Sequence, residues 1–270
     1  MSANQIHLWV AYPDDLKDEA TALACARLLN EDERTRLKRF KFDRHRREHL
    51  ATRALGRQAL SAYADIAPEA WRFEAGEHGK PAIVQDSDGR GLGGQALDGQ
   101  GLGLKFNLSN SLGLVVCAVT HGQEIGVDVE PQFRAKTIEE VAERFFSVRE
   151  LEQLEPLHGD ERRERGLTLW NLKEAYMKAR GLGMALPTKQ FSFLFEDGGG
   201  VRLEMDAEVG DAADRWRFCV LNHGGDYAEH RIALMVESED APELEVWETR
   251  PILAAPRRVE VGEVKWWPAV

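Results

Sequence analysis

The chain has 270 residues, 43% of them hydrophobic, which is enough to bury a core as one large domain or two smaller lobes. Its 46 acidic residues outnumber 35 basic ones, and the formal net charge of −11 argues against general affinity for nucleic acid. The start lacks a basic segment followed by an apolar one, and no run approaches the roughly 20 apolar residues that cross a bilayer. We therefore expect a cytoplasmic protein with no nucleic-acid or membrane partner.

The cysteines give no sign of a disulfide framework or a zinc site. Cys25, Cys117 and Cys219 are odd in number, far apart and outside any CxxC pair. We expect three reduced thiols.

The first third of the chain predicts a strand followed by helices. Residues 5–12 alternate apolar and polar side chains, as a strand does. Asn30 and Glu33 form a capping-box signature for a helix start. A long helix over 47–64 and a β-rich stretch over 71–84 are expected to follow.

One segment of this acidic chain is basic. Between Arg27 and Arg57 there are five acidic residues and eleven basic ones: Arg27, Arg34, Arg36, Lys38, Arg39, Lys41, Arg44, Arg46, Arg47, Arg53 and Arg57. Such a run is typical of a solvated helix face, or of a dock for phosphates or an acidic partner. Charge alone leaves both interpretations open.

The second half repeats this order of elements. A strand over 125–130 leads to a second capping box at Ser147 and Glu150, a long helix over 167–180 and a β-rich stretch over 191–196. The pattern predicts a duplicated α/β lobe. Chance similarity between two amphipathic segments is the alternative.

Two segments lie outside this pattern. Residues 86–103 hold seven glycines and almost no large apolar side chain, which predicts a flexible surface loop or a hinge. A phosphate-binding loop is disfavoured there, because a strand rather than a helix is expected to follow. Residues 243–270, which include Trp247, Trp266 and Trp267, are expected to pack across the surface as an extension.

The segment IGVDVE at 125–130 carries paired carboxylates. Its apolar residues alternate with Gly126, Asp128 and Glu130, so the two-residue period of a strand puts both carboxylates on one face. Their Cβ atoms would lie roughly 7 Å apart, which allows one hard cation to take an oxygen from each. Ordinary solvent-facing acids are the alternative.

The segment WNLKEAYMK at 170–178 places a third carboxylate on a helix. Trp170, Glu174 and Lys178 share one face, and an apolar stripe occupies another. Glu174 and Lys178 could be a surface ion pair. If Glu174 instead meets the two strand carboxylates, the three form an oxygen-rich site suited to Mg²⁺.

Two shorter pieces complete a series of motifs. They are GKP at 79–81 and FNLSNS at 106–111. Taken in order, GKP, FNLSNS, IGVDVE and WNLKEAYMKARGLG resemble the surfactin-synthetase-activating (Sfp-like) type of 4′-phosphopantetheinyl transferase. The resemblance covers roughly residues 5–225, and the combination of motifs is far more specific than any one of them.

The resemblance implies a fold of two similar α/β lobes related by pseudo-twofold symmetry. We accordingly expect an N-terminal lobe over 1–120, a C-terminal lobe with the metal ligands over 121–240 and an extension over 241–270. The resemblance also implies that Asp128, Glu130 and Glu174 bind Mg²⁺, and that Lys178 lies beside the reacting pyrophosphate with Lys173 nearby.

The same resemblance assigns further residues to coenzyme A. Lys80, Ser109 and Arg53 match positions that hold its phosphates, and Arg36 falls at another such position in the basic segment. Asn110 stands where the family commonly has a histidine near the nucleotide 3′-phosphate. An amide can donate a hydrogen bond but cannot become cationic, so a contact there should be weaker.

The implied reaction is transfer of 4′-phosphopantetheine from coenzyme A to a serine of an acyl or peptidyl carrier protein, with release of adenosine 3′,5′-bisphosphate. Glu174 is the expected base, and Lys178 is expected to stabilise negative charge. A magnesium-dependent phosphodiesterase and a non-catalytic binding module are the alternatives. We expect a monomer, because two lobes of one chain would enclose the site; the pathway of the carrier is left open.

Overall fold

The computed structural model describes residues 1–2, 4–84, 103–250, 254–262 and 264–268, so the predicted Gly-rich loop lies outside the described residues except for Gly103. The N-terminal lobe begins with a strand and three helices: β1 (Gln5–Ala11), α1 (Glu19–Arg27), α2 (Glu31–Arg39) and α3 (Asp43–Ser61). A hairpin and two longer strands follow: β2 (Phe73–Ala75), β3 (Pro81–Ile83), β4 (Leu104–Ser111) and β5 (Leu114–His121).

The C-terminal lobe repeats this order. It begins with β6 (Ile125–Pro131), α4 (Ala135–Phe145), α5 (Val148–Leu154) and α6 (Gly159–Arg180). It continues with the hairpin of β7 (Phe191–Phe195) and β8 (Val201–Met205), and then with β9 (Trp216–Gly224) and β10 (Glu229–Glu237). The connecting 3-10 turns are short.

Strand pairing is the same in both lobes. In each lobe the first strand pairs antiparallel with the last strand, and the last strand pairs antiparallel with the strand before it. The order is β1-β5-β4 in the N-terminal lobe and β6-β10-β9 in the C-terminal lobe. In the register, Val10 lies opposite Val116 and Val129 lies opposite Ile232. The prediction of two similar α/β lobes is therefore confirmed.

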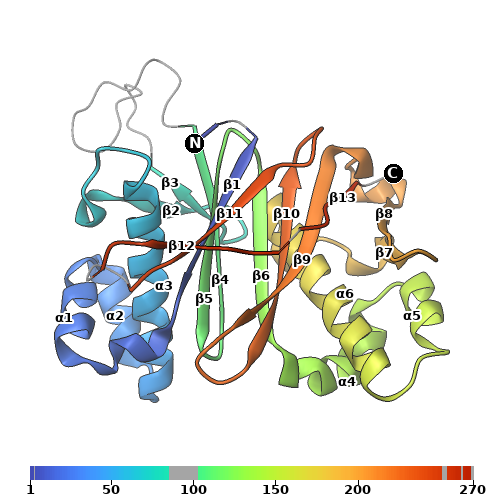
Figure 1. The fold of residues 1–270 in the computed structure, drawn as a ribbon, viewed down its shortest axis with the longest axis horizontal. Coiled ribbons are helices and arrows are strands. Elements are labelled where there is room, and N and C mark those ends of the chain that lie inside the picture. The colour runs from blue at the N-terminus through green and yellow to red at the C-terminus, as the bar shows by residue number, and fades with distance from the viewer. Residues whose placement is uncertain (3, 85–102, 251–253, 263, 269–270) are drawn as a thin grey trace.

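The two sheets lie in the middle of the molecule, with α1, α2 and α3 outside one and α4, α5 and α6 outside the other (Figure 1). Strand alternation explains these layers. On β1, Leu8 and Val10 enter a cluster with Val127 of β6, between the sheets. Trp9 and Ala11 point the other way and pack in a cluster with the N-terminal helices. A third hydrophobic cluster lies under α6.

The C-terminal segment does more than cover the surface. β11 (Glu243–Glu248) pairs in parallel with β1, and Val246 is fully buried. β12 (Arg257–Val259) pairs with β11, and β13 (Trp267–Pro268) pairs with β9. The segment thus adds strands to both sheets. The alternating ELEVWE run of β11 is a strand pattern that the sequence reading overlooked. The three-part division of the chain stays a prediction.

The expected elements are present, with shifted boundaries. Both capping boxes form, at Asn30 with Glu33 and at Ser147 with Glu150. α3 begins at Asp43 and α6 at Gly159, earlier than expected, because their first turns are charged and show no apolar period.

The three cysteines are free and buried. None of the helices within the described residues is long and apolar enough to cross a membrane.

Candidate active site

A glycine brings α6 directly against β6. A Cβ atom on Gly126 would lie 2.0 Å from the carbonyl oxygen of Ala175 and 2.4 Å from the nitrogen of Ala179. Only glycine permits this approach of strand and helix backbones. The close packing puts Glu174 and Lys178, which flank Ala175 and Ala179 on α6, beside the polar face of β6. The predicted meeting of these two motifs is therefore found in the structure.

Asp128 lies at the centre of the polar contacts. Its side chain is buried, and Oδ1 accepts hydrogen bonds from Lys178 Nζ at 2.7 Å and from Ser109 Oγ at 3.3 Å. Oδ2 accepts from Asn171 Nδ2 at 2.8 Å. Lys178 also donates to Ser109 Oγ at 2.8 Å. These contacts join β4, β6 and α6, so the cluster spans the boundary between the two lobes.

Glu130 has its own set of partners on the same face of β6. Its Oε2 accepts from Ser111 Oγ at 2.7 Å, and its Oε1 accepts from Arg134 Nη1 at 2.7 Å. Burial and the neighbouring charge of Asp128 raise the pKa of Glu130, although Ser111 and Arg134 act in the opposite direction. The two strand carboxylates are thus buried, contrary to the solvent-facing alternative.

Glu174 is the third carboxylate, and its charge is the least compensated. Burial is the largest cause that raises its pKa to about 7, followed by repulsion from Asp128, while Lys178 lowers it. Glu130 adds a smaller repulsion. Lys178 pairs with Asp128 rather than with Glu174, so the surface ion pair considered from the sequence is not formed.

These three carboxylates fit a hard cation by their chemistry. Oxygen donors are what Mg²⁺ prefers, and the pKa values of Glu130 and Glu174 are raised first by burial and then by repulsion from Asp128, which a bound cation would relieve. Within the described residues, no group of three His, Cys, Asp or Glu is arranged as a ready metal site. Lys178 and Arg134 occupy carboxylate oxygens that a cation would need.

Lys173 does not lie in this cluster. Its side chain is 3% exposed, and its Nζ binds Glu150 at 2.9 Å, the carbonyl oxygen of Thr188 at 2.6 Å and that of Phe191 at 2.7 Å. All three donors of the ammonium are engaged, and a side chain this deeply buried does not reach the surface where coenzyme A would bind, unlike that of Lys80, which is 20% exposed. The expectation for Lys173 is therefore corrected. It anchors α6 to the capping box of α5, and burial lowers its pKa.

Lys80 of the GKP motif reaches the junction of the lobes. Its Nζ donates to Glu124 Oε2 at 2.8 Å, to the Ala179 carbonyl at 2.7 Å and to the Ile125 carbonyl at 3.2 Å. Burial lowers its pKa. It also lines a pocket of about 330 Å³ on the β2–β3 hairpin. All its donors are engaged, so a phosphate contact would require the Lys80 amine to exchange a partner.

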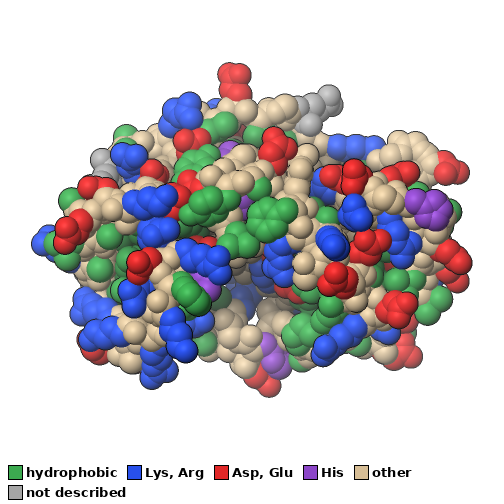
Figure 2. All heavy atoms as spheres, turned by 90° about the horizontal axis from the view of Figure 1, so that it is seen from below, with side chains coloured by type: hydrophobic (Ala, Val, Ile, Leu, Met, Phe, Trp, Pro, Cys, Tyr) green, Lys and Arg blue, Asp and Glu red, His purple; other side chains and the backbone are tan. Residues whose placement is uncertain are grey.

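A second pocket gathers the remaining residues expected to bind coenzyme A. Arg36, Arg53 and Asn110 line a cavity of about 240 Å³ together with His45 and His49. Arg53 also lies 3.5 Å from Glu33 Oε1, and burial lowers its pKa. Figure 2 shows Lys and Arg side chains gathered over the N-terminal helices on the left of this face, with a hollow between the lobes near the middle. The basic segment thus borders the candidate site.

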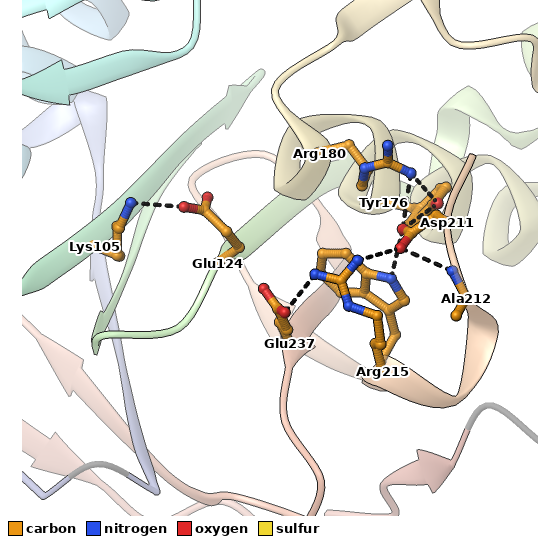
Figure 3. Close-up of polar contacts among 9 residues, drawn as sticks. Lys105, Glu124, Tyr176, Arg180, Asp211, Ala212, Arg215 and Glu237 are labelled. Atoms are coloured by element: carbon orange, nitrogen blue, oxygen red, sulfur yellow. Dashed lines mark hydrogen bonds and ion pairs between the residues drawn. The ribbon is translucent and has the colours of Figure 1, made fainter. Parts of the chain in front are cut away.

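A buried carboxylate fixes the end of α6 that carries Lys178. The side chain of Asp211 is fully buried, and its Oδ2 accepts from Tyr176, Arg180 and Trp216, each at 2.8 Å, while its Oδ1 accepts from Arg215 (Figure 3). Hydrogen bonds from these donors lower the pKa of Asp211 against the effect of burial. Tyr176 and Arg180 both lie on α6, so their hydrogen bonds to Asp211 restrict how this end of the helix can turn about its axis.

Sequence reasoning missed Asn171, Arg134 and Ser111. Asn171 precedes Lys173 and Glu174 of its own motif by less than one turn, and Ser111 ends FNLSNS. The alternation of β4 was a usable signal, since it puts Ser109 and Ser111 on one face and Asn110 on the other. Nothing in the sequence marked Arg134.

Comparison with known proteins shows the family of the chain. Residues 124–235 match the family model of the 4′-phosphopantetheinyl transferase superfamily, and residues 17–121 match that of the 4′-phosphopantetheinyl transferase N-terminal region. The chain is 34% identical to the 4′-phosphopantetheinyl transferase HetI of a Nostoc species, over 68% of this chain and 71% of that protein. It is 32% identical to the 4′-phosphopantetheinyl transferase Sfp of Bacillus subtilis, over 66% and 71%.

A crystal structure of a holo-(acyl-carrier-protein) synthase from Bacillus anthracis, in complex with CoA, matches with a TM-score of 0.35 and 22% identity. The match covers 42% of this chain and 93% of that chain. The sequence relatives and the family models show that the protein belongs to the 4′-phosphopantetheinyl transferase family. The resemblance and the class of enzyme predicted from the motifs are confirmed.

Proposed function

We propose that the protein transfers the 4′-phosphopantetheine group of coenzyme A to a serine of an apo acyl or peptidyl carrier protein. The observation that carries the proposal is the meeting of Asp128, Glu130, Glu174 and Lys178 where the two lobes join. Phosphoryl transfer depends mainly on alignment and on neutralising charge, and this cluster supplies both kinds of group.

In the proposed reaction, the serine oxygen forms a bond to the β-phosphorus of coenzyme A. The bond from that phosphorus to the bridging pyrophosphate oxygen breaks, and adenosine 3′,5′-bisphosphate leaves with the electron pair. Glu174 takes the serine proton, directly or through a water. Lys178 stabilises the departing negative charge.

We propose Asp128, Glu130 and Glu174 as the ligands of Mg²⁺. The buried, mutually repelling carboxylates support this assignment. When bound, the cation would supply electrostatic stabilisation of the pyrophosphate. Lys178 and Arg134 contact oxygens of Asp128 and Glu130, and both side chains could bind phosphate oxygens in place of these carboxylates.

The nucleotide end of coenzyme A is assigned to the N-terminal lobe. Arg36 and Arg53 line one cavity with Asn110, and this shared lining supports a phosphate site. His45 adds an imidazole that the motif comparison did not include. Ser109 and Lys80 are retained as proposed phosphate contacts, while Lys173 is not.

Two features support an acidic carrier protein as partner and a monomer as the working unit. The exposed basic residues of α2 and of the turn into α3 surround the cavity that contains Arg36, so an acidic partner would dock beside the site. All proposed site residues come from one chain, so a second copy has nothing to complete.

Intact-mass analysis of an apo carrier protein tests the proposal. The carrier is mixed with the protein, coenzyme A and Mg²⁺, and a gain of one phosphopantetheine group is the expected result. Breakdown of coenzyme A without that gain would indicate a phosphodiesterase instead. No change in either molecule would leave a binding module. A reaction with Asp128→Ala is the matched control.

A further inference from the structure

Asn171 lies in α6 and has no role in the chemistry described so far. Its side chain is fully buried. Nδ2 donates to Asp128 Oδ2 at 2.8 Å and reaches the carbonyl oxygen of Arg231 on β10 at 3.4 Å. The first contact is the shorter, and its acceptor is charged, so it is the stronger of the two. It links the middle of α6 to the central carboxylate of the site.

The other half of this amide has no partner. Among the described residues, Oδ1 of Asn171 is buried and forms no hydrogen bond. Buried polar atoms are rarely left unpaired, and an apolar side chain of similar volume would avoid the unmet acceptor. As a packing residue, asparagine is therefore a poor choice at this position. What it offers over leucine is the hydrogen bond to Asp128.

The two oxygens of Asp128 have partners of different kinds. Oδ2 contacts the short, fully buried side chain of Asn171, which has no room to withdraw. Oδ1 accepts a long hydrogen bond of 3.3 Å from Ser109 Oγ and a shorter one of 2.7 Å from Lys178, whose side chain is long, flexible and 28% exposed. The ammonium can leave Oδ1 for another anion, whereas the amide stays on Oδ2.

We infer that Asn171 is a positioning residue, which holds Oδ2 of Asp128 and so presents Oδ1 alone to the divalent cation. Lys178 is the removable occupant of Oδ1 when no metal is bound. This inference rests on the proposed function. A carboxylate that offers one oxygen suits Mg²⁺, which demands near-octahedral geometry. Residues that orient a ligand in this way commonly change metal affinity by about 10- to 100-fold.

Binding of Mn²⁺, used as the probe in place of Mg²⁺, tests the inference without any turnover. The free ion is measured by electron paramagnetic resonance on metal-stripped protein with coenzyme A present. We expect Asn171→Leu and Asn171→Ala to raise the Kd for Mn²⁺ by about 10- to 100-fold. Asp128→Ala gives the reference for a lost ligand.

Gln153→Leu is the control for loss of a hydrogen-bonded amide, here a half-buried one. Gln153 exchanges two hydrogen bonds with the backbone of Phe195, each 2.9 Å long, and has no contact with the site. Its variant should bind Mn²⁺ as the wild type does. Asn171→Ala introduces no bulk, so the Kd of this variant for Mn²⁺ tests the inference if Asn171→Leu does not fold.

Transfer assays give a second readout. The Mg²⁺ concentration for half-maximal transfer should rise in the Asn171 variants by the same factor as the Kd, while kcat at saturating Mg²⁺ stays within a few-fold of wild type. Wild-type Mn²⁺ affinity in folded Asn171→Ala would overturn the inference and leave the proposed function intact. Absence of Mn²⁺ binding or of transfer by the wild type would overturn the proposed function itself.

Discussion

In the N-terminal lobe, the face of β1 that looks toward α3 carries Trp9 and Ala11, and both pack in a hydrophobic cluster. In the C-terminal lobe, the face of β6 that looks toward α6 carries Gly126, Asp128 and Glu130. The pairing of the strands is the same in both lobes. A single topology thus supports a largely apolar layer on one side, with His7 bonded to Tyr63 at its margin, and a buried polar site on the other. The side chains of one strand face make the difference.

The largest effect should come from Gly126→Ala, which removes the feature that separates β6 from β1. The new Cβ would meet the backbone of α6, which cannot shift as a side chain can. We expect a loss of about 3 kcal/mol in the free energy of unfolding, measured in urea, together with loss of transfer. Gly166→Ala, where a Cβ meets no atom within 4 Å, should instead stabilise α6 by about 0.5–1 kcal/mol. Equal stability of the two variants would disprove the close-packing argument.

Removing a carboxylate should destroy activity without unfolding the lobe. We expect Asp128→Ala or Glu174→Ala to lower the transfer rate by about 100-fold or more, because each loses a charged group from the site. EDTA should act likewise. Asp160→Ala, at an exposed carboxylate on the same helix, should have no such effect. Near-normal turnover by either site variant at saturating Mg²⁺, with circular dichroism and melting temperature unchanged, would refute the metal assignment.

The buried carboxylates of the C-terminal lobe should lower the free energy of unfolding. The corresponding layer of the N-terminal lobe carries no such penalty. The pKa of Glu174 is raised to about 7 in the folded protein from an ordinary value of 4.5, so the folded state binds the proton more tightly. The resulting penalty is absent below pH 4.5, grows between pH 4.5 and 7, and is complete above pH 7. In EDTA, Glu174→Gln should therefore be more stable than wild type by about 2 kcal/mol at pH 8 and by much less at pH 5. A gap of the same size at both pH values would contradict this explanation.

The basic exterior of the N-terminal lobe should act on the carrier rather than on the chemical step. Raising NaCl should increase the KM for carrier protein more than it lowers kcat, because exposed charges are screened over a Debye length of roughly 8 Å. Charge reversal at Arg39 and Arg44 should raise the same KM several-fold. Lys265→Glu, on the C-terminal segment, serves as the control for net charge. A carrier KM that is flat in salt, or indifferent to reversal, would separate this lobe from carrier recognition.

The smallest effect is expected at Asn110. A hydrogen bond to a charged group contributes about 1.5–3 kcal/mol and a neutral one about 1, so Asn110→His should lower the KM for coenzyme A several-fold below pH 7. The kcat should not change, because the 3′-phosphate lies far from the reacting bond. The test is kcat/KM for coenzyme A and for dephospho-coenzyme A. An unaltered ratio would mean that Asn110 does not face that phosphate, or that His45 already supplies the imidazole.

Strand alternation and capping made most of the fold predictable. The duplication followed from two capping boxes, two long helices and two strands in the same order, each of which is a local pattern. The alternating run of β11 was a local signal that was overlooked, whereas its pairing with β1, at the other end of the chain, is not encoded in any local pattern. The starts of α3 and α6 were placed too late, because charged first turns have no apolar period.

The site was predictable where a motif lay on a regular element. Asp128, Glu130, Glu174 and Lys178 meet as expected, since strand and helix periods set their faces. Lys173 was misplaced, because adjacent helical residues point in directions about 100° apart and only packing decides which one is buried. The contact of Asn171 with Asp128 depends on the distance between α6 and β6, which no period encodes, whereas Arg134 reaches Glu130 four residues away through the turn that follows β6.

The pairing of β11 with β1 has a consequence for synthesis. During translation β1 is made before both of the strands that pair with it. Its hydrogen bonds are complete only after β5 and then β11 have been synthesised. The N-terminal sheet therefore keeps one open edge until nearly the whole chain has left the ribosome. Open strand edges invite pairing with other chains. Truncation before residue 243 should accordingly be seen first as aggregation of newly made protein, ahead of any change in catalysis.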